Sequence, residues 1–110
     1  MPSCGCLAIG PRFPDAVQER RGGVDGTGGR FADVDVIKCK TCDRLWLRYQ
    51  IEYEGVSRSG RWAEALIDDE TARRIAPEQA SDYIESQAWH VFGGSYWGHA
   101  GQRGQGKLRW

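Results

Sequence analysis

The stretch Cys39-Lys40-Thr41-Cys42 places two thiols two residues apart, between two segments whose side chains alternate as in strands. A tight turn with this spacing can direct both sulfurs to one point, and structural zinc sites are closed, tetrahedral and built from Cys or His. A second thiol pair near the N-terminus brings the cysteine count of the chain to 4. The spacing therefore predicts one structural Zn²⁺ with four thiolate ligands, Cys4, Cys6, Cys39 and Cys42.

Residue 43 follows this pair and is Asp, where zinc knuckles often have a left-handed Gly. Asp tolerates the left-handed conformation better than most residues do, so the knuckle is still expected. Two alternatives stay open. Disulfides need an oxidising compartment, whereas the N-terminus has neither a basic start nor an apolar run typical of a signal peptide, which favours the cytoplasm. Alternatively, His90 or His99 completes the site in place of Cys4 and Cys6.

Length and charge limit the classes of protein to consider. The chain has 110 residues, which indicates one domain with a modest core that a metal ion would supplement. It has no apolar run of membrane-spanning length. The formal net charge is zero, which argues against a general nucleic-acid binder. The charge is uneven, because residues 49–96 carry 9 acidic and only 4 basic side chains.

Alternation of apolar and polar side chains predicts the sheet. Residues 31–38, 45–53 and 61–67 are expected to be strands, and residues 89–92 a short final strand. The longest strand has one apolar face that should be core, formed by Leu45, Leu47, Tyr49, Ile51 and Tyr53. Its other face is predicted to be outside the core and carries Trp46, Arg48, Gln50, Glu52 and Glu54.

Helical spacing of apolar residues, after a Pro suited to a first turn, predicts the main helix over residues 77–88. Tyr83 and Ile84 should pack this helix against the strand core. Residues 15–21 are expected to form at most one helical turn, residues 22–29 a flexible glycine-rich loop, and residues 97–110 a loose tail. The predicted fold is α+β, a single zinc-stabilised domain in which a small antiparallel sheet carries a zinc-ribbon-like knuckle and one main C-terminal helix.

The chain also resembles a family, on several features together: Cys-x-Cys, Cys-x-x-Cys, Trp46 four residues after the last Cys, Trp62 after the hairpin, a helix, and Trp89 followed by Gly93-Gly94-Ser95-Tyr96. These features look like small bacterial four-cysteine proteins, some of which are similar to immunity proteins encoded beside secreted toxins. The resemblance implies a protein that binds and blocks one cognate toxin. It implies the zinc role of the four cysteines, but it identifies no toxin contacts and gives the Gly-Gly-Ser-Tyr stretch no role.

The charge pattern suggests where such a partner would bind. Toxins that act on nucleic acid tend to have basic clefts, which an acidic patch can occupy by electrostatic complementarity. A neighbouring aromatic side chain would supply buried anchor area. The candidate partner-binding residues are Glu52, Glu54, Asp68, Asp69, Glu70, Trp46 and Trp62.

The alternative function is a nucleic-acid-binding zinc ribbon. Lys38, Lys40, Arg44 and Arg48 lie near the knuckle, and Trp46 would stack on a base. No catalytic constellation is recognisable, because four thiolates leave zinc no open position for water and no nucleophile has a partner in sequence. The sequence therefore predicts a binding protein and not an enzyme.

Overall fold

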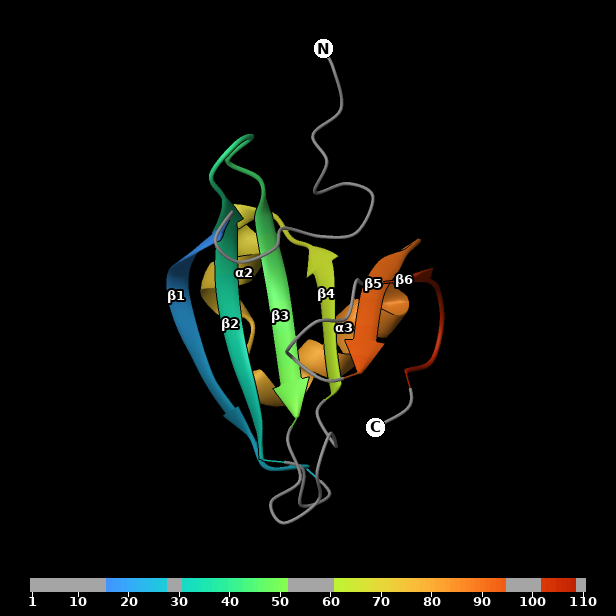
Figure 1. Ribbon diagram of the computed structural model, residues 1–110. Helices are drawn as coiled ribbons and strands as arrows, with labels where there is room; N and C mark the ends of the chain where they lie inside the picture. The colour runs from blue at the N-terminus through green and yellow to red at the C-terminus, as the bar shows by residue number, and fades with distance from the viewer. Residues whose placement is uncertain (1–15, 28–30, 52–60, 95–101, 109–110) are drawn as a thin grey trace.

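The computed structural model describes residues 16–27, 31–51, 61–94 and 102–108 (Figure 1). Its elements confirm the predicted α+β class with an antiparallel sheet. In chain order they are β1 (Ala16–Asp25), β2 (Ala32–Cys39), β3 (Leu45–Ile51), β4 (Arg61–Leu66), α2 (Asp69–Arg74), the 3-10 turn η2 (Pro77–Gln79), α3 (Ala80–Ser86), β5 (His90–Gly94) and β6 (Gln102–Gly104).

The described strands form one antiparallel sheet in which each strand pairs with its neighbours in sequence, in the order β1-β2-β3-β4-β5-β6. The helical segment between β4 and β5 lies on one side of the sheet, behind it in Figure 1. We call this side the helix face and the opposite side the second face. Because side chains alternate along a strand, each central strand contributes to both faces.

The helix face holds the larger core. Val36, Leu47 and Ala65 form one row of partners across β2, β3 and β4, and α3 covers this face with Ile84. Of the five predicted core residues, Leu47, Tyr49 and Ile51 are fully buried and Leu45 is partly buried, which confirms the predicted face. Ile84 is buried and Tyr83 packs at the edge of the core, also as predicted, whereas Tyr53 lies outside the described residues.

The prediction of a helical turn followed by a loop was wrong for residues 16–25. The described residues form strand β1, which continues into the glycines and reaches Asp25. Two register shifts against β2 bend this strand, one between Gln18 and Arg20 and one at Gly22. A Cβ on Gly22 would lie 2.9 Å from the backbone oxygen of Val34, so the close approach of the two strands requires glycine.

The helix predicted over residues 77–88 is present, but it is shorter than expected and is not the main helix of the chain. Pro77 begins a 3-10 turn as a first-turn proline can, and the α-helix proper runs only from Ala80 to Ser86, similar in length to α2. The Ser86 hydroxyl donates to the Tyr83 carbonyl at 2.7 Å, and Gln87 is extended, so the helix ends before residue 88. One 3-10 turn and one short α-helix thus occupy the range predicted as a single helix, and α2 is a separate helix before it.

The described part of the predicted loose tail is ordered against the sheet. Gln102–Gly104 is strand β6, and further along the chain the Leu108 N–H donates to Glu85 of α3 at 2.9 Å. Glycines allow aromatic rings to pack directly on the backbone of these strands, because a Cβ on Gly104 would lie only 2.7 Å from the Phe92 ring. A Cβ on Gly93 would likewise meet the Trp62 indole at 2.7 Å, which gives the first glycine of the Gly-Gly-Ser-Tyr stretch a packing role.

Candidate metal centre and interaction surfaces

The turn between β2 and β3 holds Cys39 and Cys42 and is closed by two backbone hydrogen bonds. The Cys39 N–H donates to the Arg44 carbonyl at 3.0 Å, and the Asp43 N–H donates to the Cys39 carbonyl at 2.9 Å. Asp43 has a φ of 62°, so the expected left-handed conformation is confirmed. Cys39 is buried and Cys42 is partly buried, and both pack against Trp46 and its neighbours.

The remaining predicted ligands, Cys4 and Cys6, lie outside the described residues, as does His99. Within the described ranges, no group of three or more His, Cys, Asp or Glu side chains is placed to hold a metal ion. Two thiolates are half of a tetrahedral set, and their chemistry fits Zn²⁺. The described residues therefore place two cysteine thiols in one turn.

His90, the alternative ligand, lies in a different environment. It is buried beside Phe92, with ring centroids 5.9 Å apart, and close to Gly104 of β6. Burial lowers the pKa of His90, and the backbone carbonyl of Ile84 and the carboxylate of Glu85 partly offset this effect. These neighbours place His90 beneath α3.

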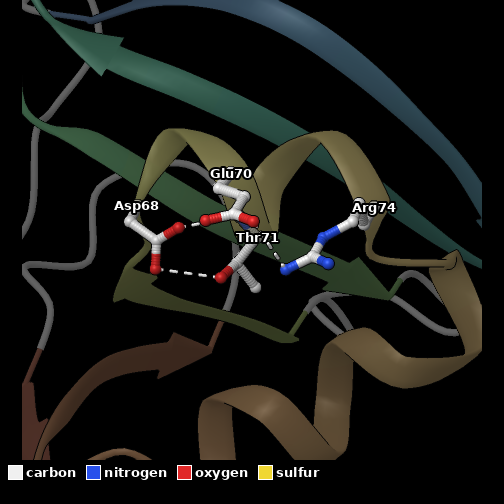
Figure 2. Close-up of polar contacts among 4 residues, drawn as sticks. All are labelled: Asp68, Glu70, Thr71 and Arg74. Carbon is white, nitrogen blue, oxygen red and sulfur yellow. Dashed lines mark hydrogen bonds and ion pairs between the residues drawn. The ribbon is translucent and has the colours of Figure 1, made fainter.

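The acidic run Asp68-Asp69-Glu70 forms the start of α2. Asp68 is the N-cap: its carboxylate accepts the Thr71 N–H at 2.7 Å and the Thr71 hydroxyl at 2.9 Å (Figure 2). The Thr71 backbone bond is the main cause that lowers the pKa of Asp68. The sequence signal for this role is an Asp immediately before a helix start, the position at which Asp is a preferred N-cap.

The other two carboxylates of the run form ion pairs one turn further along α2. Asp69 lies 2.9 Å from Arg73 and Glu70 lies 3.2 Å from Arg74, the second pair being drawn in Figure 2. All four side chains are exposed, and such pairs contribute little to stability. The run is therefore available at the surface, although Arg73 and Arg74 partly balance its charge. Glu52 and Glu54 lie outside the described residues.

The second face of the sheet carries a buried aromatic cluster, which corrects the prediction that Trp46 lies outside the core. Trp46 is 0% exposed, and its ring contacts Trp89 edge to face with centroids 5.8 Å apart. Arg103 of β6 stacks over Trp89, with its guanidinium carbon 3.9 Å from the ring centroid. Trp46 therefore cannot serve as an exposed partner anchor, whereas Trp62 is half-buried.

A buried ion pair lies beside this cluster. Arg48 on β3 donates through Nε to Oε1 of Glu64 on β4 at 2.8 Å, and Glu64 is 3% exposed. Burial raises the pKa of Glu64 to about 7, with Arg48 acting in the opposite direction. Among the described residues, the buried atoms without a hydrogen-bond partner are Glu64 Oε2, Trp46 Nε1 and, on the helix face, His90 Nδ1.

Sequence reasoning did not single out Glu64, because acidic side chains are rarely buried. A signal was present in residues 62–66. Trp62 and Leu66 flank Glu64 on the same face of β4, and two large apolar neighbours indicate a face that is buried. The ion pair also occupies Arg48, one of the basic residues named for nucleic-acid binding.

Comparisons with protein-family models, curated proteins and solved structures found no match to this chain. Among the described residues, every helix is too short or too polar to cross a membrane.

Proposed function

We propose that this chain is a zinc-stabilised domain that binds another protein. Its Zn²⁺ would be held by Cys39 and Cys42 together with Cys4 and Cys6. The observation that carries the zinc site is the knuckle turn with left-handed Asp43. The register supports the second thiol pair, because Ala16 pairs with Cys39, so the polypeptide that precedes β1 enters the sheet beside the knuckle. The intervening residues can span roughly 3.3 Å each, ample to return Cys6 to this end.

The zinc site is tested in the full chain by metal analysis of single-cysteine variants. We expect one zinc per chain in the native protein, and loss of zinc with marked loss of thermal stability in Cys39→Ser and Cys42→Ser, because binding and folding are coupled in small zinc domains. Thr41→Ser, in the same turn, is the matched control and should keep both. Folded, zinc-free protein with disulfide-linked cysteines would contradict the proposal.

The partner is proposed to be a protein, most concretely a bacterial toxin that this domain binds and neutralises in the cytoplasm, as the resemblance to immunity proteins implies. Support comes from the engagement of several residues that nucleic-acid binding would need in contacts within the protein. Arg48 is paired with Glu64, Arg103 stacks on Trp89, and Trp46 is buried away from any base. The exposed acidic run of α2 suits a basic surface on the partner.

The partner proposal is tested by measuring association with the product of the neighbouring gene. Asp69→Lys combined with Glu70→Lys should slow association about tenfold at low salt and weaken its salt dependence, because steering depends on the local field. Asp68→Ser removes a charge but keeps an N-cap oxygen, which separates charge from helix capping.

Glu78→Lys is the control for the partner test, since Glu78 is also an exposed acidic residue but lies on η2. If it slows association as much as the α2 changes, the effect reflects net charge and not this surface. Titrations with DNA and RNA at physiological salt test the alternative zinc-ribbon function. Submicromolar nucleic-acid binding without a retained protein partner would overturn the proposal.

A further inference from the structure

The Arg48–Glu64 pair belongs to a row of residues that crosses the second face of the sheet. In the register of the strands, Asp35 of β2 lies opposite Arg48, Arg48 opposite Glu64, and Glu64 opposite Val91 of β5. Residues directly opposite one another in an antiparallel sheet have Cβ atoms about 5 Å apart and share a face. Arg48 therefore lies between two carboxylates, on its β2 side and on its β4 side.

The two carboxylates have unequal surroundings. Asp35 is half-exposed and accepts a bond from Gln18 Nε2 at 3.4 Å. Glu64 is buried, its strand neighbours on this face are Trp62 and Leu66, and its partner on β5 is the apolar Val91. The charged groups nearest to Glu64 along the row are Arg48 on one side and Arg103, beyond Val91, on the other.

We propose that Glu64 is the proton acceptor of a conformational switch in which Arg48 exchanges Glu64 for Asp35 as its carboxylate partner. Oε1 of Glu64 is engaged by Arg48, so a solvent proton adds to Oε2, which has no hydrogen-bond partner among the described residues. A neutral carboxyl accepts a much weaker bond from a guanidinium than a carboxylate does. Arg48 keeps its charge and turns to the carboxylate opposite it on β2.

The switch operates close to neutral pH. Desolvation disfavours the charged form of a buried carboxyl, and this is the main cause that raises the pKa of Glu64 to about 7. Above this pH, Arg48 ties β3 to β4; below it, Arg48 ties β3 to β2. The change occurs beside the Trp46 and Trp89 rings, so the packing of the second face would report it.

The test is NMR titration of the full chain from pH 5 to 9, following the Glu64 side-chain carboxyl carbon and Arg48 Nε. Both signals should shift with one common midpoint near 7, the midpoint that burial gives Glu64. Glu64→Gln should abolish the shift at Arg48 Nε, and Asp35→Asn should keep the Glu64 titration while reducing the response of Arg48. His90, whose ring packs with Phe92 and not with the Trp46 cluster, is followed separately through its ring C–H signals.

Glu19→Gln is the matched control, because Glu19 is an exposed carboxylate that pairs with Lys38 at 3.9 Å on the same sheet. It should leave both titrations unchanged. The switch is overturned if Glu64 titrates below pH 5, or if Arg48 Nε responds to pH in Glu64→Gln as in the native protein. An unaltered Arg48 response in Asp35→Asn would overturn the partner exchange. If Glu64→Gln fails to fold, the titration of the Glu64 carboxyl in the native protein and the Arg48 response in Asp35→Asn still test the switch.

Discussion

Replacing Trp46 by alanine is expected to lower the free energy of unfolding by about 3–5 kcal/mol, the usual cost of truncating a buried aromatic residue. Trp46 is fully buried and forms one cluster with Ile37, Cys39 and Val91, so removal of its ring leaves a cavity inside this cluster. Denaturant unfolding followed by circular dichroism measures the change. A loss below about 1 kcal/mol would show that the second face is not a core.

Two variants control for the origin of this loss. Trp46→Phe should keep most of the stability, because the indole N–H has no hydrogen-bond partner among the described residues and an unmade bond cannot be lost. Trp62→Ala should cost less than Trp46→Ala, because Trp62 is only half-buried on the same face. Equal losses in all three variants would indicate general disruption of the sheet.

The free energy of unfolding should fall by up to about 3 kcal/mol as pH rises from about 4.5 to 7, owing to Glu64. The folded protein binds this proton more tightly than the unfolded chain does, because burial raises the pKa from 4.5 to about 7. Below this window the carboxyl is protonated in both states. Above it, both states are ionised and the folded state bears the full cost of a buried charge.

Glu64→Gln should remove this decline, and the difference between native and variant protein isolates Glu64 from other titrating groups. His90 acts in the opposite sense, because its lowered pKa makes the folded state lose stability as pH falls through the range where the unfolded histidine protonates. Chemical denaturation at several pH values measures both contributions. A native protein whose difference from Glu64→Gln is constant between pH 4.5 and 8 would contradict the raised pKa.

The helix-face core could be predicted from sequence because Leu47, Tyr49 and Ile51 alternate cleanly with polar neighbours. The core on the second face could not be predicted, because its residues occupy the alternate positions of the same strands. Trp46 shares its face with Arg48, and a face that mixes apolar and charged side chains looks solvent-exposed in the sequence. The missing principle was that a sheet can be buried on both sides. A buried charge then needs a partner, and Glu64 finds one in Arg48 on the neighbouring strand.

Strand β1 was missed for a different reason. Its sequence combines charged residues with Gly22 and Gly23, and neither propensity nor period indicates a strand. Pairing with β2 holds strand β1 in place, and this pairing is a tertiary contact that the local sequence does not reveal. The candidate sites divide in the same way: the left-handed Asp43 follows from local turn chemistry, whereas ligation by Cys4 and Cys6 stays a prediction.

The sequential strand order also bears on how the chain reaches its native state. β2 and β3 are joined by a short turn, and the β1–β2, β3–β4 and β5–β6 pairs also join strands consecutive in the chain, so each closes a modest loop. Only the β4–β5 pair closes over the helical segment. Because closure entropy rises slowly with loop length, even this step adds only about 1 kcal/mol. The search for the native topology is therefore mostly local, which favours rapid folding for a β-rich chain.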